Sequence, residues 1–404
     1  MSVSTRSRLW LPFTQMAAFD ACERTFVRAS GAYLFDARGR RIFDAISSVW
    51  TNVHGHCHPH IVERIAEQAS ILDHATLLGA TNPVAEALAA RLAEICGLQY
   101  AFFASDGASA IEAALKMALQ FWQNAGEPQR TRFVRLRSAY HGDTAGAMSV
   151  SDIRLFKERF GAITFESRAF EESDAARGDD VAAVIVEPLV QAAAGMQLAS
   201  RAQHEALSGM TPLLVVDEIA TGFGRTGTMF AFEQTALRPD IVCVGKGLTG
   251  GTLPLSATVV ADRIYAAFLG AAHEHRQFFH GHSYAGNPIA CAAALASLEL
   301  FERERTLERV AGLAECWSRQ ARSLQLLDGI REVRSCGLMS GIELRTERLA
   351  ASDAATPAWR VAAGLYERGF FTRPIGETVQ FVPPLCSTPE ELEGFARALA
   401  AVIA

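Results

Sequence analysis

The sequence has no long apolar run and no excess of positive charge. Its 404 residues carry a net charge of −6 at pH 7, so no broad basic surface is available to bind nucleic acid or an anionic membrane. Residues 1–16 lack the apolar core of a secretion signal, and no apolar run approaches the ~20 residues that a membrane span needs. These absences predict a cytoplasmic protein.

The sequence also lacks paired cysteines, internal repeats and linkers rich in proline or serine. Its eight cysteines show no regular spacing and no C-x-x-C pair, and Cys96, Cys243 and Cys291 lie in apolar runs. This usage predicts reduced thiols in the core of an intracellular protein. A chain of this length without long linkers predicts two or three closely packed lobes.

Apolar runs of strand length recur through the middle of the chain. They alternate with helical stretches and cover residues 132–136, 181–186, 213–216 and 241–244. Continuous apolar runs are typical of strands covered on both faces, so they predict a mostly parallel sheet in an α/β domain. Ligands of such sheets gather at the carboxyl ends of the strands.

A second, smaller lobe is predicted toward the C-terminus. From about Phe301 the composition changes to a charged helical segment, and strand candidates follow at residues 341–344 and 379–382. Residues 31–36 are predicted to form a hairpin arm that joins this lobe. We therefore expect a large α/β domain and a smaller α+β domain.

Lys246 is the first candidate for chemistry. It follows an apolar strand and has a glycine on either side. If its amine is drawn into the interior, desolvation lowers its pKa and makes it nucleophilic enough to form a Schiff base. The alternative is a lysine at a strand end that reaches solvent.

Asp217 ends the preceding apolar strand, so it is expected to meet Lys246 at one edge of the sheet. Pyridoxal phosphate needs such a pair, because a lysine binds its aldehyde and an acid keeps its ring nitrogen protonated. Asp217 could instead cap a turn or pair with Arg225. The following Gly222–Gly227 fits the G-x-G-x-x-G spacing, but residues 218–221 separate it from the strand and no helical pattern follows, which disfavours a dinucleotide-binding turn.

A helix predicted to begin near Gly107 offers a candidate phosphate site. Small residues there, Gly107 and Ala108, let backbone amides approach a dianion, which the helix dipole favours. The alternative is an ordinary helix with Asp106 or a serine as its N-cap. Tyr140, after the next strand, could stack on a flat cofactor ring or line the core.

Eight of the eleven histidines fall in two clusters, at residues 54–60 and 273–282. In the first cluster every second residue is a histidine, so in an extended chain they would all face one side. Zinc ligands usually have spacings that let them converge on one ion, so we expect no metal and assign these histidines to a substrate loop or the surface.

The chemical candidates lie in blocks that resemble the pyridoxal-phosphate-dependent aminotransferases of fold type I, class III. That family carries an aspartate in a D-E-x-x-x-G-F-G-R-T-G block and a Schiff-base lysine after the next strand, and this chain has both, at residues 217–227 and at Lys246. Within the class, the chain is most similar to the enzymes of biotin synthesis. The other blocks that carry the resemblance are residues 10–16, 47–50, 140–144, 280–284, 286–288 and 373–374.

The resemblance implies pyridoxal 5′-phosphate as the cofactor and transamination between a small-molecule amino donor and a keto acceptor as the reaction. It implies an N-terminal segment of the small domain (1–47), a large cofactor-binding domain (48–300) and a C-terminal small domain (301–404). It also implies a homodimer with shared active sites, without nucleic acid or membrane partners.

The same resemblance assigns roles to single residues around the cofactor. Lys246, Asp217 and Tyr140 are the implied catalytic residues, with the Tyr140 ring stacked on the cofactor. The amides of Gly107 and Ala108 are the implied ligands of its phosphate.

Further residues are implied at the phosphate and in the substrate channel. Ser283, with His282 beside it, is expected to reach the phosphate of the neighbouring subunit. Trp50 is expected to wall the substrate channel, and Arg373 to bind the substrate carboxylate, a task suited to a bidentate donor. Arg225 is expected to help position the substrate.

Three positions in the expected substrate pocket depart from the biotin-pathway pattern. Phe13 replaces a frequent tyrosine, Val49 replaces one residue of a tryptophan pair, and Gln380 stands where a tyrosine is usual. They leave open a related class III enzyme for another ω-amine, β-amino acid or diamine. The amino donor also stays open between S-adenosylmethionine, lysine and other amines. A pyridoxal-binding protein without activity is a third possibility, which the presence of Lys246 and Asp217 disfavours.

Overall fold

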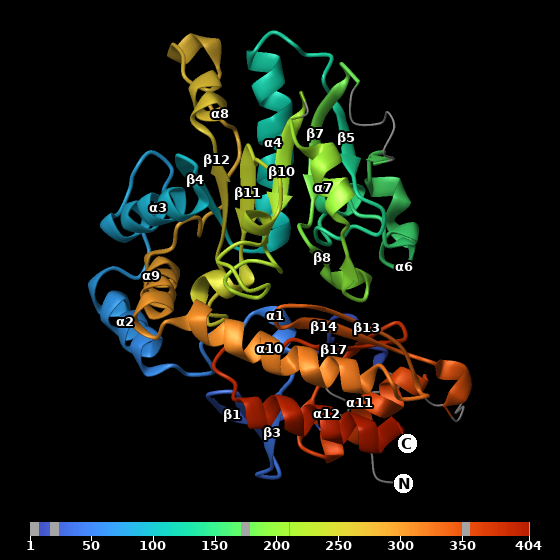
Figure 1. Cartoon of the computed structure of the whole chain (residues 1–404). Coiled ribbons are helices and arrows are strands. Elements are labelled where there is room, and N and C mark those ends of the chain that lie inside the picture. Colours follow the sequence, from blue (N-terminus) through green and yellow to red (C-terminus); the bar gives the residue numbers. More distant parts are fainter. Residues whose placement is uncertain (1–7, 17–23, 171–177, 210, 350–355, 404) are drawn as a thin grey trace.

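The computed structural model describes residues 8–16, 24–170, 178–209, 211–349 and 356–403. In Figure 1 a large sheet and its helices fill the upper part, and the orange to red C-terminal helices form a lower layer. The blue N-terminal strands lie in this lower part as well, beside the C-terminal helices. Among the described helices, none combines the length and apolarity needed to cross a membrane.

The large lobe is organised around a seven-stranded sheet with the order β4-β12-β11-β10-β7-β5-β6. Strand β12 runs antiparallel to its two neighbours, and the other neighbouring strands are parallel. In this order the strands are β4 (Tyr100–Ala104), β12 (Ser256–Val260), β11 (Ile241–Val244), β10 (Leu213–Asp217), β7 (Val181–Val186), β5 (Arg132–Arg135) and β6 (Arg168–Ala169).

The predicted mostly parallel α/β sheet is confirmed. Strands β5, β7, β10 and β11 coincide with the four apolar runs, and all residues of β7, β10 and β11 are buried. Strands β4 and β12 read Y-A-F-F-A and S-A-T-V-V, and they are not predicted from the sequence because they lack a continuous run of large aliphatic residues. Because β12 is the antiparallel strand, a prediction without it does not show that the sheet is mixed.

Helix α4 (Gly107–Asn124) packs across β7, β10, β11 and β12. Its apolar face is buried at Ile111, Ala114, Leu115, Ala118 and Trp122, while Leu119 is partly buried. The other helices of this lobe are α2 (Pro59–Ile71), α3 (Pro83–Cys96), α5 (Ala145–Ser149), α6 (Arg154–Lys157), α7 (Arg201–Leu207), α8 (Asp262–Ala267) and α9 (Pro288–Arg303).

The C-terminal lobe has a four-stranded sheet with the order β13-β14-β17-β16. The strands predicted at 341–344 and 379–382 fall largely within β14 and β17. The elements of this lobe are β13 (Ile330–Cys336), β14 (Met339–Leu344), β16 (Pro374–Ile375), β17 (Thr378–Phe381), α10 (Thr306–Leu324), α11 (Pro357–Glu367) and α12 (Pro389–Ile403).

The charged helical segment predicted from Phe301 is not continuous. Helix α9 ends at Arg303, and the backbone turns at Arg305, whose φ of 50° lies in the left-handed region. Because this conformation interrupts the helix, α10 begins only at Thr306. Residues 301–303 therefore belong to the last helix of the large lobe.

A third sheet joins the two ends of the chain, with the order β1-β2-β3-β15. Strands β1 (Phe26–Ser30) and β2 (Tyr33–Asp36) form a hairpin that turns at Gly31, as predicted for this region. Strand β3 (Arg41–Asp44) pairs in parallel with β15 (Phe370–Phe371). The N-terminal arm thus packs on the C-terminal part of the chain, whereas the domain limits at residues 47 and 300 stay predictions.

Candidate active site

A cavity of about 720 Å³ lies at the carboxyl ends of the central strands. Trp50, Thr51, the start of α4 and the loops after β5, β7, β10 and β11 surround it. Its lining includes Trp50, Ser105, Gly107, Ala108, Tyr140, His141, Asp143, Glu187, Asp217, Ile219 and Lys246. The structure therefore brings together all three predicted catalytic residues and the two small residues that begin α4.

Neighbouring strands place Asp217 and Lys246 on this cavity. Asp217 is the last residue of β10 and pairs in register with Cys243 of the parallel strand β11. Lys246 lies just beyond β11, at the start of the short 3₁₀ helix η5 (Lys246–Thr249). The two residues, which the sequence places at one edge of the sheet, thus line one cavity.

The amine of Lys246 lies in a largely desolvated part of the cavity. Burial lowers its pKa, although the carboxylates of Asp217 and Glu187 act in the opposite direction. Within the described chain no carboxylate forms an ion pair with its Nζ, which lies 5.1 Å from the ring centroid of Trp50. This environment favours the neutral amine, the form able to attack a carbonyl.

The carboxylate of Asp217 is buried and hydrogen-bonded at both oxygens. His141 Nδ1 lies 2.7 Å from Asp217 Oδ2, and the amide of Ile219 donates to Oδ1 at 3.0 Å. The possible pairing of Asp217 with Arg225 does not occur. His141 is a site residue that the sequence did not predict, and its position directly after Tyr140 is the signal that could have indicated it.

The first turn of α4 reaches the same cavity. Asp106 is the N-cap, and its side chain accepts a hydrogen bond from the amide of Ser109 at 3.0 Å. The amides of Gly107 and Ala108 precede the first intrahelical donor, so no carbonyl of the helix can satisfy them. Asp106 is thus the N-cap, as in the alternative prediction of an ordinary helix. It leaves the amides of Gly107 and Ala108 pointing out of the helix end, where an anion is favoured.

Close packing explains the glycine at the start of this helix. A Cβ atom on Gly107 would lie 2.8 Å from Cγ2 of Ile219, the residue that follows the Asp217–Glu218 pair. On the loop after β5, a Cβ on Gly142 would lie 2.5 Å from the Cβ of Ala108. The two glycines therefore allow the loops after β5 and β10 to approach the helix start.

Tyr140 is held from two sides. Its amide donates to Glu187 Oε2 at 2.9 Å, and its hydroxyl donates to Asp143 Oδ2 at 2.9 Å. Burial raises the pKa of the Tyr140 phenol, so the side chain is uncharged at neutral pH. Burial also raises the pKa of Glu187 to about 7. Through its hydrogen bond with the Tyr140 amide, Glu187 holds the backbone at Tyr140 in place.

Trp50 reaches the cavity from a left-handed turn. The element α1 (Ser47–Trp50) has φ values of 48°, 49°, 65° and 66° at its four residues, none of which is glycine. Left-handed backbone costs roughly 1–2 kcal/mol for each such residue. Strain of this kind persists only where surrounding contacts impose it, and it concentrates at functional sites.

Four residues predicted to bind substrate do not line the cavity: Phe13, Arg225, Arg373 and Gln380. For Arg225 the prediction does not fit its surroundings, because the guanidinium is buried and donates to the carbonyls of Asn52 and Pro383. Burial also lowers the pKa of Arg225 to about 10.

Gln380 lies one layer behind the cavity. Its Oε1 accepts from Trp50 Nε1 at 2.8 Å, and its Nε2 donates to the carbonyl of Arg373 at 2.7 Å. The guanidinium of Arg373 donates from Nη2 to the carbonyl of Phe13 at 2.5 Å. The Phe13 ring packs on Phe156, 5.2 Å between centroids.

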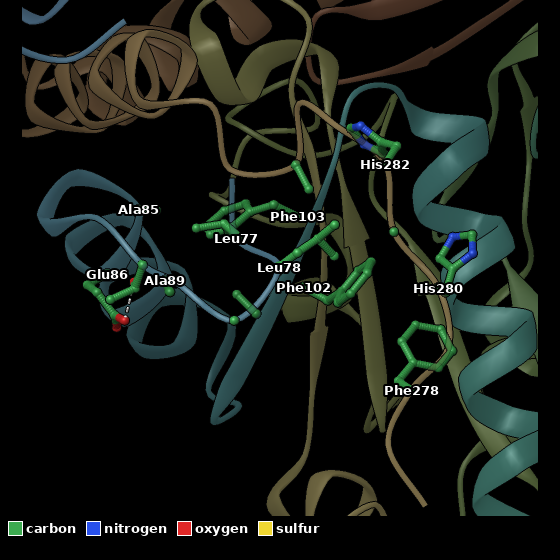
Figure 2. A pocket seen from close by; sticks show the side chains of 15 residues that line it. Leu77, Leu78, Ala85, Glu86, Ala89, Phe102, Phe103, Phe278, His280 and His282 are labelled. Atoms are coloured by element: carbon green, nitrogen blue, oxygen red, sulfur yellow. Dashed lines mark hydrogen bonds between the residues drawn. The ribbon is translucent and has the colours of Figure 1, made fainter. Parts of the chain in front are cut away.

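His282 lies beside Ser105, which directly precedes the α4 N-cap Asp106, and neither His282 nor Ser283 lines the Lys246 cavity. The ring of His282 is 3.4 Å from Ser105 Oγ at its closer nitrogen, and Ser283 is exposed. Figure 2 shows His282 at the edge of a second cavity of about 400 Å³, which Leu77, Leu78 and Phe278 also line.

The histidines of residues 54–60 do not face one side. His56 pairs with Asp44, His58 with Glu304 and His60 with Glu299, while His54 is buried against Ser297. The chain bends at Cys57 and enters α2 at Pro59, so the expected alternation of an extended segment is wrong here. In the described part of the chain, no group of three or more histidine, cysteine, aspartate or glutamate side chains could hold a metal ion.

The cysteines that the sequence placed in the core are buried. Burial raises the pKa of the thiols of Cys96, Cys243 and Cys291, which disfavours the thiolate form. The described cysteines are free thiols.

Comparison with known proteins identifies the family. The family model for class III aminotransferases matches residues 17–403. The chain belongs to the class III aminotransferases. It is 39% identical to the adenosylmethionine-8-amino-7-oxononanoate aminotransferase of Anoxybacillus flavithermus, over 96% of this chain and 93% of that protein.

Solved structures agree with this class III aminotransferase fold. The enzyme of the same name from Methanocaldococcus jannaschii superposes with a TM-score of 0.91 at 37% identity, covering 98% of this chain and 96% of that one. An amine transaminase from an uncultivated Pseudomonas species, in its PLP-bound form, gives a TM-score of 0.89 at 29% identity, with 99% of both chains covered. The predicted fold type I architecture and pyridoxal phosphate dependence are thereby confirmed.

Proposed function

We propose that this class III aminotransferase transfers the amino group of S-adenosylmethionine to 8-amino-7-oxononanoate, which yields 7,8-diaminononanoate in biotin synthesis. The observation that carries the proposal is the meeting of Asp217 and Lys246 on one cavity in a chain that is 36–40% identical to several relatives named for this reaction. The reaction class follows from the family, and the substrates are taken from the names of those relatives.

The cavity fits pyridoxal phosphate in three respects. It presents a lysine with a lowered pKa, a buried carboxylate, and a helix start with two unsatisfied amides. We infer that Lys246 binds the aldehyde, Asp217 the ring nitrogen, and the amides of Gly107 and Ala108 the phosphate. When bound, the cofactor supplies an electron sink for the carbon that loses a proton.

The chain itself supplies the proton transfers and the enclosure. We propose that Lys246 Nζ, once free, would take a proton from the donor carbon that bears the amine and pass it to the cofactor carbon that carried the aldehyde; with the keto acceptor it would carry out the same transfer in reverse. The His141–Asp217 pair keeps a negative charge in place opposite the ring nitrogen. Trp50 and Tyr140 wall the cavity and restrict the access of water.

We further propose that the enzyme is a homodimer with shared sites. Leu78, which lines the cavity in Figure 2, exposes 76% of its surface, and Phe279 and Tyr284, each adjacent in sequence to a lining residue, expose 64% and 63%. Neighbouring exposed apolar side chains of this size mark an interaction surface. A second copy that covers them would bring Ser283, which is exposed here, to the phosphate of its partner.

A direct assay tests the proposed reaction. The purified protein with pyridoxal phosphate, S-adenosylmethionine and 8-amino-7-oxononanoate should form diaminononanoate, detected by mass spectrometry. The chain has only three lysines, so borohydride reduction followed by peptide mapping should place the cofactor on Lys246 and on neither Lys116 nor Lys157. Lys246→Ala should lose the visible cofactor band and turnover, whereas Lys116→Ala should retain both.

The second candidate is a class III aminotransferase for another ω-amine, β-amino acid or diamine. Phe13 in place of a tyrosine near the predicted carboxylate site, and the amine transaminase among the structural neighbours, favour it. A donor screen that includes lysine, diamines and β-amino acids separates the two. Rescue of a biotin auxotroph by this chain would support the first candidate, and failure with an active donor from the screen would support the second.

A further inference from the structure

The left-handed turn Ser47–Trp50 determines where the Trp50 indole lies. Its backbone is in a region that residues with side chains rarely adopt, and Val49 is β-branched, which makes that region less accessible still. The turn nevertheless delivers the indole to the cavity wall, 5.1 Å from Lys246 Nζ. Contacts outside the turn must therefore impose its shape.

Arg225 contacts both ends of the turn. Its Nη2 donates to the carbonyl of Asn52 at 2.6 Å, and its Nη1 donates to Ser47 Oγ at 3.2 Å and to the carbonyl of Pro383 at 2.7 Å. Ser47 Oγ in turn donates to the carbonyl of Val382 at 2.7 Å. The turn is thus attached to the segment that follows β17.

Gln380 contacts the indole itself. An indole nitrogen can only donate, so the amide oxygen of Gln380 must face Trp50 and the amide nitrogen must face the carbonyl of Arg373. Gln380 is buried in β17 and does not line the cavity. Both ends of its amide are used, so it has no group directed at a substrate.

We propose that Gln380 and Arg225 are positioning residues that impose the left-handed turn and thereby fix the Trp50 indole as a rigid wall of the substrate cavity. This inference rests on the proposed function, because it assigns the substrate side of the cavity to Trp50. Gln380 then shapes the substrate site through Trp50, without touching the substrate or the cofactor. The glutamine accepts from the indole and donates to the Arg373 carbonyl from two different atoms, which the single hydroxyl oxygen of a tyrosine cannot do.

A double-mutant cycle tests the inference. Gln380→Leu should raise KM for the keto acceptor roughly tenfold and change kcat much less, because it leaves the buried indole N–H unsatisfied and the wall free to move. In a Trp50→Phe background, which has no N–H to lose, the same substitution should change KM by less than about twofold. Equal effects of Gln380→Leu in both backgrounds would overturn the proposal.

A second readout needs no substrate. The chain has five tryptophans, so the contribution of Trp50 is the fluorescence difference between the wild type and Trp50→Phe. Gln380→Leu should make that component more accessible to acrylamide, and Gln380→Glu, which keeps an acceptor for the indole, should restore most of the protection. An unchanged quenching constant in Gln380→Leu would overturn the proposal.

A matched control and a second variant separate this role from simple stability. Gln68 is another buried glutamine, located on α2, and its amide donates to the carbonyl of Leu72 at 2.9 Å. Gln68→Leu should therefore leave KM and Trp50 quenching unchanged.

If Gln380→Leu does not fold, Arg225→Lys should give the same quenching change, because one ammonium cannot reach both ends of the turn. An unchanged quenching constant in Arg225→Lys would overturn the proposal. If the proposed reaction is wrong, the wild type will be inactive in the assay. The quenching measurements need no substrate, so they test the role of Gln380 independently of that reaction.

Discussion

His141 Nδ1 and Asp217 Oδ2 lie 2.7 Å apart, and both side chains are buried. The other ring nitrogen of His141 is buried and has no hydrogen-bond partner in the described part of the chain. The contact with Asp217 is therefore the polar interaction that orients this imidazole. It places a proton donor behind the carboxylate proposed to face the cofactor ring.

Replacing His141 should weaken cofactor binding. His141→Phe removes the donor to Asp217 and keeps a ring of similar shape, so pyridoxal phosphate should bind roughly 10- to 100-fold more weakly, the range for one hydrogen bond to a charged group. Fluorescence titration of the apoenzyme measures the dissociation constant. His204→Phe, at another buried histidine, is the control. An unchanged affinity in His141→Phe would show that the pair has no part in binding the cofactor.

The start of α4 should not tolerate a side chain at Gly107. In Gly107→Ala the new Cβ would lie 2.8 Å from Ile219, so either the helix start or the Ile219 loop must move, and we expect weaker cofactor binding and a lower melting temperature. Gly312→Ala, in an open position of α10, should instead stabilise by about 0.5–1 kcal/mol. Calorimetry with and without cofactor compares them. Equal behaviour of the two variants would contradict the close packing.

Glu218 should make stability depend on pH. Burial raises its pKa to about 7 from an ordinary value of 4.5, so the folded state keeps a proton that the unfolded state releases. The folded state therefore loses stability as pH rises from about 4.5 through about 7, by an amount on the order of 2–3 kcal/mol.

Glu218→Gln should remove the part of the pH dependence that Glu218 contributes, while the part from Glu187, whose pKa burial also raises to about 7, should remain. Glutamine can accept from the amide of Phe232 and donate to Thr221, the two partners of Glu218. Urea unfolding at pH 5 and pH 8, at one protein concentration, gives the difference in the free energy of unfolding between the two pH values for each protein. If wild type and Glu218→Gln lose stability equally over this range, another group carries the effect.

A charge at Leu78 should prevent the proposed dimer. Leu78→Glu puts a carboxylate on the apolar surface beside the cavity of Figure 2, where desolvation would make association unfavourable. Leu326→Glu is the matched control, since Leu326 is 86% exposed after α10, away from this surface. Sedimentation velocity should show a monomer for the first variant only. A dimer in both would place the interface elsewhere.

The sequence predicted the parts of the site that depend on strand ends. Because parallel strands in register bring their carboxyl ends together, Asp217 and Lys246 could be assigned to one edge before the fold was known. The helix start at Gly107 was also predictable, since its apolar face has the helical period.

The surroundings of those residues could not be predicted in the same way. The contact of His141 with Asp217, and that of Gln380 with Trp50, join residues far apart in the chain, and no local pattern encodes them. The left-handed turn at Ser47 is opposed by local preference and depends on Arg225 and on residues near Val382. The sequence motif around Arg225 likewise does not show that its guanidinium donates to the backbone carbonyls of Asn52 and Pro383, and for this reason Arg225 was predicted to help position the substrate.

The parallel pairing of β3 with β15 has a consequence for biosynthesis of the chain. A ribosome releases the N-terminal hairpin long before Phe370 and Phe371 emerge, so the hairpin waits with one edge unpaired while the large sheet assembles. Assembly of the N-terminal arm is therefore a late event that requires the last part of the polypeptide. Nascent chains stalled before residue 370 should leave the arm open to proteolysis, even where the central sheet already resists it.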